Sequence, residues 1–174
     1  MNDRKLLSFE LGRMSPEEYR RRPETGIVLI LDNIRSAHNI GSAFRTADAF
    51  GVDKIWLCGI CAVPPSAEIH KSALGAEDSV PWEHRADTLS LVRELQASGY
   101  TVLSAEQTEH AMLLQHFRRV PGARYAIVFG NEVDGVQQEV VDACDGCIVI
   151  PQFGTKHSLN VSVSMGVVLW ELVR

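Results

Sequence analysis

The chain has 174 residues, which is enough for a single domain with a hydrophobic core. Apolar residues make up 45% of the sequence and charged residues 22%, an ordinary balance for a globular protein. No apolar run approaches the roughly 18–20 residues that span a bilayer, and residues 1–24 lack the apolar core of a secretory signal. The composition therefore excludes a transmembrane protein and predicts a cytoplasmic protein with no membrane partner.

Basic and acidic residues are unevenly spread along the chain. Their numbers, 17 and 22, give a net charge of −5, which argues against a surface that binds nucleic acid nonspecifically. Three stretches nevertheless contain no acidic residue: 33–47, 110–131 and 149–170. If these stretches meet in the fold, they give an acidic protein one positive face.

The first part of the chain is polar and rich in arginine. We treat residues 1–25 as an N-terminal extension and expect it to be helical, because the Ser-Pro-Glu-Glu sequence at 15–18 is typical of a capped helix start. Residues 26–174 contain no internal repeat, low-complexity tract or linker, so they are predicted to form one domain.

From residue 26 onward, strand and helix patterns alternate. Short apolar runs predict strands at 26–31, 53–59, 100–106, 124–130 and 147–151. Helical periodicity predicts helices at 39–51, 87–98, 136–143 and 158–173. Prolines at 64, 65 and 81 predict that residues 60–84 are irregular. The alternation indicates an α/β fold, with a parallel sheet covered by helices on both faces.

The helix predicted at 158–173 is apolar on nearly every face. Its apolar residues include Val161, Val163, Met165, Val167, Val168, Leu169, Trp170 and Leu172. Such a helix has to be covered all round, and one small domain covers about half of it. A partner subunit would supply the rest, so we predict a homodimer. The alternative is a helix buried wholly within the monomer.

Four cysteines form two C-x-x-C pairs, Cys58 with Cys61 and Cys144 with Cys147. A four-cysteine zinc site is one interpretation of these pairs. However, residues 62–143 separate the pairs, whereas a zinc ribbon has only about 15–20 residues between them. The first pair also follows a predicted strand while the second opens one, which puts them at opposite edges of a parallel sheet. We therefore expect four reduced thiols and no bound metal.

Three polar segments follow predicted strands, at the edge where doubly wound sheets bind ligands. They are residues 33–45, 130–136 and 151–160. No G-x-G-x-x-G follows a strand and no G-x-x-x-x-G-K-[ST] occurs, so the fingerprints of dinucleotide and P-loop nucleotide sites are absent from the sequence. The pattern predicts a ligand site at the carboxyl ends of the strands without identifying the ligand.

These segments resemble a known family. The sequences NIGSAFR (39–45), FGNEVDGV (129–136) and IPQFGTKHSLNVS (150–162) look like the three ordered motifs of the SpoU/TrmH family, the RNA 2′-O-ribose methyltransferases of the SPOUT superfamily. The resemblance runs from about residue 26 to residue 173. It implies a single-domain SPOUT-type parallel sheet, a C-terminal trefoil knot and dimerisation through the knot region. One departure is Gln152, where the third motif usually has methionine beside the cofactor loop.

The same resemblance implies roles for single residues. The catalytic set would be Asn39, Arg45, Glu132, Ser158 and Asn160. The cofactor S-adenosylmethionine would be held by Gly130, Asn131, Ile150, Ser158 and Leu159. No metal is implied.

Each of these residues also has a purely structural interpretation. Asn39 could be only the N-cap of the helix that it precedes, and Ser158 and Asn160 could cap the last helix. Arg45 could pair with Asp48 on the surface. Glu132 could be stabilised by the dipole of a nearby helix N-terminus.

The activity implied by the resemblance is methyl transfer from S-adenosylmethionine to a ribose 2′-hydroxyl of structured RNA. A guanidinium keeps its proton near neutral pH. Arg45 would therefore be either a base activated by its surroundings or an electrostatic partner of phosphate and alkoxide. Arg35, Arg118 and Arg119 are candidate RNA contacts because they lie in the acid-free stretches.

The substrate and two rival functions remain open at this point. Only residues 1–25 precede the first predicted strand, so we expect tRNA rather than rRNA, with rRNA as the alternative. The rival functions are a nucleotide-binding hydrolase on a similar sheet and a catalytically silent RNA-binding module with the same fold.

Overall fold

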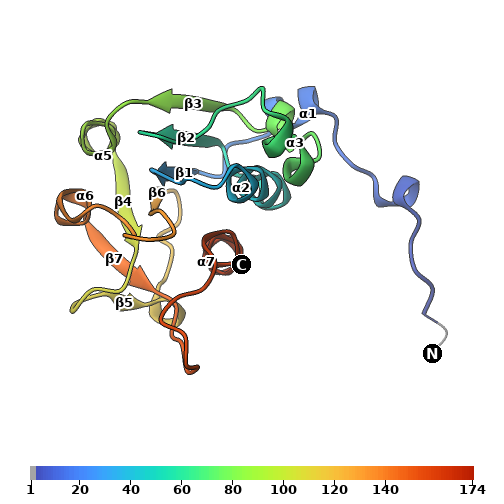
Figure 1. Ribbon diagram of the computed structural model, residues 1–174. Helices are drawn as coiled ribbons and strands as arrows, with labels where there is room; N and C mark the ends of the chain where they lie inside the picture. Colours follow the sequence, from blue (N-terminus) through green and yellow to red (C-terminus); the bar gives the residue numbers. More distant parts are fainter. Residues whose placement is uncertain (1–2) are drawn as a thin grey trace.

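The computed structural model describes residues 3–174, apart from the side chains of residues 8 and 9 (Figure 1). Over this range the centre is a seven-stranded sheet whose neighbouring strands all pair in parallel. In spatial order the strands are β3 (Trp82–Arg85), β2 (Lys54–Cys58), β1 (Ile27–Asp32), β6 (Arg124–Phe129), β4 (Tyr100–Ala105), β7 (Gly146–Val149) and β5 (Met112–Leu113). This is the parallel sheet that the alternating pattern predicts.

Helices cover both faces of the sheet, as Figure 1 shows. One face carries α2 (Ala37–Phe50), α3 (Ala67–Ala73), α4 (Ala76–Ser79) and α7 (Val161–Val173), and the other carries α5 (Thr88–Ala97) and α6 (Gln138–Ala143). Residues of β1 alternate between the two cores: Ile27, Leu29 and Leu31 lie in the first, and Val28 and Ile30 in the second. All five are buried, as a strand covered on both faces requires. The predicted fold class is confirmed.

Helix α2 begins two residues earlier than predicted. Ser36 is its N-cap, and the Ser36 hydroxyl accepts a hydrogen bond from the backbone N–H of Asn39. The interpretation of Asn39 as the N-cap is therefore wrong. Asn39 lies in the first turn, so its side chain is not used for capping. The helix ends at Gly51, whose φ of 66° is that of a left-handed C-cap.

The prediction that residues 60–84 are irregular is wrong. They contain α3, α4 and β3. Ser66 caps α3 just after the first two prolines, and β3 begins directly after Pro81 at the edge of the sheet. The prolines therefore delimit these elements rather than prevent them. α3 packs so closely on α2 that a Cβ on Gly41 would collide with the carbonyl oxygen of Ile69. The absence of a side chain at Gly41 therefore permits this packing.

The N-terminal extension is helical in two short pieces, η1 (Ser8–Leu11) and α1 (Pro16–Arg21). α1 starts where the sequence predicts. The Ser15 hydroxyl accepts a hydrogen bond from the backbone N–H of Glu18, and the Glu18 carboxylate accepts one from the backbone N–H of Ser15. This reciprocal pair is a capping box, which explains why so short a helix forms.

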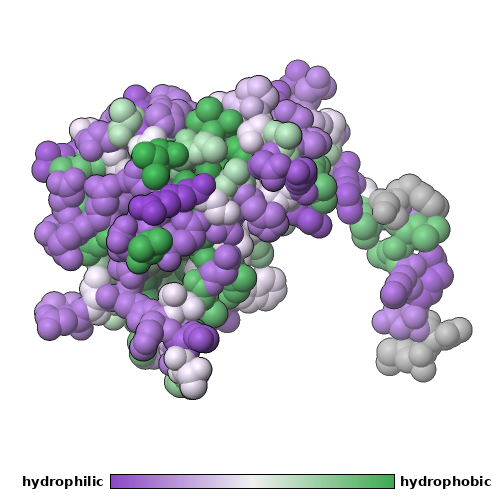
Figure 2. All heavy atoms as spheres, viewed as in Figure 1, coloured by the Kyte–Doolittle hydropathy of each residue, from purple (hydrophilic) through white to green (hydrophobic). Residues whose placement is uncertain are grey.

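α1 belongs to the packed body of the molecule. The ring of Tyr19 is buried in the first core, and its hydroxyl donates to the carbonyl oxygens of Ala47 and Val52. Residues 3–11, in contrast, reach away from the body (Figure 1, and Figure 2 in the same view). The division of the chain into an extension of residues 1–25 and a domain of residues 26–174 stays a prediction. Tyr19 of the extension packs into the core of that domain.

Helix α7 begins at Val161 rather than at 158, because Asn160 is its N-cap. One face of α7 is buried and consists of Met165, Val168, Leu169 and Leu172. The opposite face is apolar yet open to solvent, with Val163 51%, Val167 39% and Trp170 62% exposed. The alternative of a helix buried wholly within the monomer is therefore wrong. None of the helices in residues 3–174, α7 included, is long and apolar enough to cross a membrane.

The two C-x-x-C pairs lie far apart in the sheet. Three strands separate β2, which ends at Cys58, from β7, which contains Cys147. Neighbouring strands are about 4.8 Å apart, so the pairs are separated by on the order of 19 Å, and one four-cysteine zinc site is excluded. Burial raises the pKa of the Cys58 and Cys144 thiols to about 12 and that of Cys61 to about 11. These thiols stay protonated and unreactive at neutral pH.

Candidate active site

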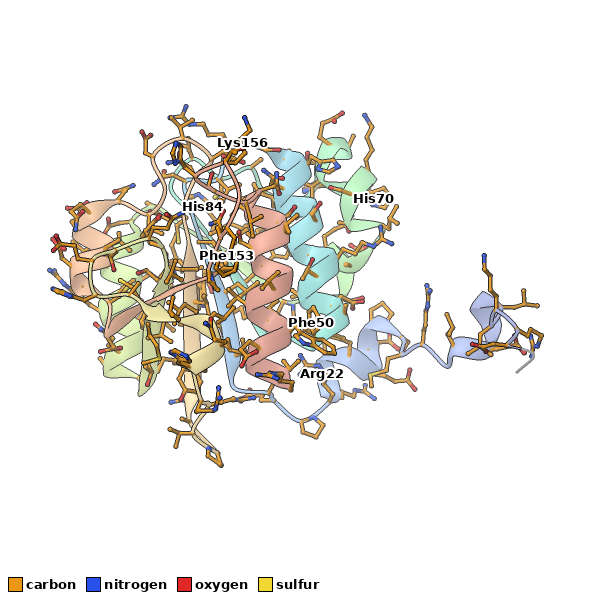
Figure 3. All side chains as sticks on the ribbon, turned by 90° about the horizontal axis from the view of Figure 1, so that it is seen from below. Arg22, Phe50, His70, His84, Phe153 and Lys156 are labelled. Atoms are coloured by element: carbon orange, nitrogen blue, oxygen red, sulfur yellow. The ribbon has the colours of Figure 1, made fainter. Side chains whose placement is uncertain are left out.

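A cavity of about 510 Å³ opens at the carboxyl ends of β6, β4 and β7, three neighbouring strands. Its lining residues come from segments 105–107, 129–135, 148–152 and 157–164. In Figure 3, α2 and α7 run side by side, and Lys156 of the loop before α7 lies near one end of both helices. Two of the three polar segments predicted to form a site therefore supply its walls, and the third lies at the start of α2.

The loop after β6 is compact and held by its own hydrogen bonds. The backbone groups of Asn131 and Gly135 exchange two hydrogen bonds of 3.1 Å, and the Asn131 side-chain oxygen accepts from the backbone N–H groups of Val133 and Asp134 at 2.8 Å. A Cβ on Gly130 would collide with the backbone of Gly135. Glycine at position 130 thus lets the loop fold back on itself. The folded loop places Glu132 next to the start of α2.

Three of the residues predicted to be catalytic meet in one hydrogen-bonded network. Nδ2 of Asn39 donates to Oε1 of Glu132 over 2.7 Å, and Nδ2 of Asn160 donates to Oδ1 of Asn39 over 3.3 Å. The backbone N–H groups of Arg35 and Ser36 each donate to the Glu132 carboxylate over 3.3 Å. The network joins the loop after β6, the start of α2 and the start of α7.

The hydrogen bonds around Glu132 decide its charge. Burial acts to raise the pKa of Glu132, but the hydrogen bonds from the Asn39 side chain and from the backbone outweigh burial and hold this pKa below its ordinary value. Glu132 is therefore ionised at neutral pH and is a weak base. The Glu132 carboxylate also lies at the N-terminus of α2, as its structural interpretation requires. The dipole of α2 therefore helps to stabilise the negative charge of this carboxylate.

All the residues predicted to hold the cofactor line this cavity, namely Gly130, Asn131, Ile150, Ser158 and Leu159. Gln152, the departure from the third motif, lines it as well. The described lining also contains the carboxylates Glu106, Glu132 and Asp134 and the imidazole of His157, but no lysine or arginine. Such a lining suits a ligand with positive charge and offers no cationic side chain to a polyphosphate.

Arg45 does not reach this cavity within one chain. It is exposed on α2, six residues beyond Asn39 and so about 9 Å farther along the helix axis. Arg45 borders a second hollow of about 680 Å³, which it shares with Arg13 and Tyr19. Among residues 3–174 no ion pair joins Arg45 to Asp48, so the surface pair offered as its structural interpretation does not form.

The three candidate RNA contacts do not lie together. Arg35 is exposed beside the cavity, with its guanidinium 3.8 Å from the carboxylate of Asp134. Arg118 and Arg119 precede β6 and therefore lie at the opposite, amino edge of the sheet, where Arg119 donates to the carbonyl oxygen of Thr25. The expectation that the acid-free stretches form one face with the site is wrong for these two arginines. Their contact with RNA stays a prediction.

Three polar residues of the lining lie outside the segments and motifs that the sequence singled out: Glu106, Gln107 and Ser164. Glu106 and Gln107 directly follow β4, the strand between β6 and β7. The rule that ligands bind at the carboxyl ends of strands points to this segment as well as to the other three, so it could have been found. Ser164 carries no signal beyond its nearness to the third motif, and His157 lies within that motif without a predicted role.

Comparisons with known proteins bear on the same residues. A model of the SpoU rRNA Methylase family matches residues 26–170. The chain is 36% identical over 151 residues to the 23S rRNA (guanosine-2′-O-)-methyltransferase RlmB of Neisseria meningitidis, which covers 87% of this chain and 59% of that protein. The Vibrio cholerae protein of the same name is also 36% identical, over 87% of this chain and 60% of its own. The chain thus spans about three fifths of the length of these curated relatives.

Solved structures give a consistent picture. The A. aeolicus TrmH/SpoU tRNA modifying enzyme superposes with a TM-score of 0.78 at 27% identity, covering 90% of this chain and 78% of that chain. The AdoMet-bound rRNA methyltransferase from Sinorhizobium meliloti superposes with a TM-score of 0.79 at 28% identity, covering 92% of this chain and 60% of that chain. The likeness therefore extends over nearly the whole of the described chain.

Proposed function

Because this chain belongs to the SpoU rRNA methylase family, we propose that it transfers a methyl group from S-adenosylmethionine to a ribose 2′-hydroxyl of RNA. The observation that carries the proposal is the network of Asn39, Glu132 and Asn160, in which Glu132 and Asn160 line a cavity that also holds two other carboxylates. The relatives carry names for this chemistry, and the AdoMet-bound structural relative names the methyl donor.

The cavity fits S-adenosylmethionine by the chemistry of its lining. The sulfonium and ammonium groups of this cofactor are positive, and the described lining holds three carboxylates and neither lysine nor arginine. The residues that would hold it are Gly130, Asn131, Ile150, Ser158 and Leu159, and their backbone groups suit the polar edge of an adenine. When bound, the cofactor supplies an activated methyl group.

Glu132 positions the site and does not take the proton of the ribose hydroxyl. Its pKa lies below the ordinary value, and three donors already use its two oxygens: the Asn39 amide and the backbone N–H groups of Arg35 and Ser36. By fixing Asn39, Glu132 also fixes Asn160 through the second hydrogen bond of the network. Placing the hydroxyl in line with the methyl group contributes much of the acceleration in such a transfer.

In this proposal Arg45 acts through its positive charge and does not take the proton of the ribose hydroxyl. A guanidinium keeps its proton but presents a planar fork of donors that matches phosphate. In the proposed reaction Arg45 binds the phosphate next to the target ribose and stabilises the alkoxide that develops on the 2′-oxygen. This role needs Arg45 close to the cavity, a position that it does not occupy within its own chain.

A second copy of the chain would bring Arg45 to the cavity. The exposed apolar face of α7, formed by Val163, Val167 and Trp170, starts beside the cavity at Asn160, and α7 packs along α2. A two-fold dimer over this face would cover the apolar side chains of both copies. It would also set α2 of one copy next to the cavity of the other. We therefore propose a homodimer with shared sites.

The nature of the RNA is the finer part of the proposal. The curated relatives are named as 23S rRNA methyltransferases, whereas one structural relative is named as a tRNA modifying enzyme. The preference for tRNA drawn from the sequence has no support in the curated relatives, so we propose a structured RNA with rRNA and tRNA as the two alternatives. The trefoil knot and the cytoplasmic location stay predictions.

The test is methyl transfer to defined RNA pools. The purified protein is incubated with labelled S-adenosylmethionine and either unmodified tRNA or rRNA transcripts, and the RNA is then digested to nucleosides. We expect a 2′-O-methylated nucleoside from one pool and none from an Arg45→Ala preparation purified in parallel. RNA binding without transfer would favour a catalytically silent module, and methylation on a base alone would overturn the proposed chemistry.

A further inference from the structure

One carboxylate in the cavity has so far been given no role of its own beyond its negative charge. Glu106 directly follows β4, lines the cavity and is half-buried. It lies outside the three motifs on which the family resemblance rests, and outside the hydrogen-bonded network of Asn39, Glu132 and Asn160. Its place in the fold is central, because β4 is the middle one of the three strands whose ends form the cavity floor.

The orientation of the Glu106 carboxylate is fixed by backbone groups. Oε2 accepts a hydrogen bond from the N–H of Val136 over 3.1 Å, and Oε1 accepts one from the N–H of Gln107 over 2.8 Å. Gly135 has a φ of 70°, and a Cβ there would collide with Oε2 of Glu106. The loop after β6 is therefore built against this carboxylate. A carboxylate has about four lone-pair positions, so about two remain for a ligand.

Glu106 differs from the other carboxylates of the lining in its partners. Glu132 accepts a hydrogen bond from the side chain of Asn39, and Asp134 lies 3.8 Å from the guanidinium of Arg35. Among the residues that the structure describes, no side chain donates to Glu106 and no cation pairs with it. A half-buried carboxylate satisfied only by two peptide groups has capacity for donors that arrive from outside the chain.

We propose that Glu106 accepts hydrogen bonds from the ribose hydroxyls of S-adenosylmethionine. This inference rests on the proposed function. The ribose is the central part of that cofactor, joined to adenine on one side and to the methionine part on the other. Glu106 stands on the middle strand of the floor, between the loops that begin at Gly130 and Ile150. A carboxylate after a strand is also a general solution for binding a ribose hydroxyl in α/β proteins.

The experiment measures affinity rather than turnover, by calorimetry with the full-length protein. The ligands are S-adenosylmethionine, S-adenosylhomocysteine and the 2′-deoxy analogue of S-adenosylhomocysteine. A hydrogen bond to a charged group contributes more to affinity than one to a neutral group. Glu106→Gln should therefore lower the affinity for S-adenosylmethionine and for S-adenosylhomocysteine by the same factor, about tenfold. The wild type should bind the 2′-deoxy analogue about tenfold more weakly than S-adenosylhomocysteine, whereas Glu106→Gln should no longer distinguish the two. Glu109→Gln, an exposed carboxylate outside the lining, is the matched control and should change nothing.

Other results would overturn the inference in distinguishable ways. Loss of affinity for S-adenosylmethionine alone would mean that Glu106 responds to the sulfonium charge. An equal loss for the 2′-deoxy analogue would mean that Glu106 acts only by holding the loop after β6. If Glu106→Gln does not fold, the wild type still decides, because equal affinity for the ribose and 2′-deoxy ligands contradicts the proposal. Failure of the wild type to bind S-adenosylmethionine at all would instead refute the proposed function itself.

Discussion

The two helical layers of this sheet differ in how completely one chain covers them. In the layer of α5 and α6, α5 buries Leu91 and Leu95 and turns charged Arg93 and Glu94 to solvent. In the layer of α2 and α7, α7 is apolar on its outer face too, where Trp170 is 62% exposed. An amphipathic helix buries its apolar face within the chain and exposes only its polar face. A helix that is apolar all round leaves an exposed apolar surface, which is typical of a protein interface.

The incomplete layer also carries three of the residues that we propose for the chemistry. Asn39 and Arg45 lie on α2, and Asn160 caps α7. The α5 and α6 layer contributes no residue to the described lining of the cavity. Function and missing coverage therefore coincide on one side of the sheet. A second copy packed on α7 would complete both, and substitutions on α2 and α7 test whether it does.

Arg45 should give the largest effect on activity. Arg45→Lys keeps the charge but loses the planar fork, so turnover should fall roughly 10²–10³-fold, the scale of losing one preorganised oxyanion donor. Arg45→Ala should fall further. Both variants should bind S-adenosylmethionine like the wild type, because Arg45 does not line the cavity. Single-turnover methyl transfer and calorimetry check the two statements, and near-normal turnover in Arg45→Ala would remove this residue from the mechanism.

Mixed dimers should show which copy supplies Arg45. One copy carries Arg45→Ala and the other carries Glu132→Gln, and differently tagged chains are purified as a heterodimer. If each cavity uses the arginine of the partner, one cavity of this heterodimer combines the wild-type Glu132 of one chain with the wild-type Arg45 of the other, and the second cavity carries both substitutions. In detail, the Glu132→Gln chain donates its intact Arg45 to the intact cavity of the Arg45→Ala chain, so one working site of two is restored.

Two mutant homodimers serve as controls for that experiment, and both should be impaired. If Arg45 instead acts in the cavity of its own chain, both sites of the heterodimer are defective. Methyl transfer by the heterodimer would then be as low as that of the two mutant homodimers. The contrast does not depend on an exact rate, only on whether mixing restores transfer.

Trp170 should govern the association of the two copies. Introducing a charge by Trp170→Glu on the outer face of α7 should weaken the dimer by about 2–4 kcal/mol, the cost typical of a central aromatic residue in an interface. Sedimentation equilibrium should then show monomer at concentrations where the wild type is dimeric. A wild-type protein that sediments as a monomer would contradict the dimer, and so would an unchanged association constant in the variant.

The sequence predicted the elements whose signal is local. The apolar strand over Ile27–Asp32 and the capped start of α1 at Ser15 follow from periodicity and from capping chemistry, and both are found. Residues 60–84 were misjudged because a proline restricts only itself and its near neighbours along the chain, so α3 forms beyond the first two prolines, from Ser66 and seven helical residues.

The site was predictable in part for the same reason. Asn39, Glu132 and Asn160 meet because each lies at the carboxyl edge of the sheet, a position that strand order dictates. In the proposed dimer, the distance of Arg45 from a cavity depends on how α2 faces the second copy, which is not a property of its own sequence neighbourhood. Glu106 lies outside the recognised motifs, so only its place after β4 reveals it.

Glu132→Gln should destabilise the protein by about 1–2 kcal/mol, because the variant leaves backbone donors at the start of α2 poorly paired. The sign of its pH dependence follows from the lowered pKa of Glu132. The contribution of the carboxylate is present above the ordinary pKa of a glutamate and is lost as the pH falls through the lower, folded-state pKa. Urea unfolding at several pH values measures it. The difference between wild type and variant should be full at pH 7 and shrink in acid, and a difference that grows in acid would contradict the network.

The smallest effect should come from the α5 layer, which serves as the reference for the others. Arg93 is exposed on α5 and lies outside both the described cavity lining and the ion pairs found in residues 3–174. Arg93→Gln should therefore change the free energy of unfolding by no more than about 0.5 kcal/mol, as is usual for such surface positions. Association, cofactor affinity and turnover should match the wild type when measured beside Arg45→Ala. A large loss of methyl transfer with unchanged cofactor affinity would place RNA on the α5 layer. In that case the division between an inert layer and a functional one would fail, even if every substitution on α2 and α7 behaved as expected.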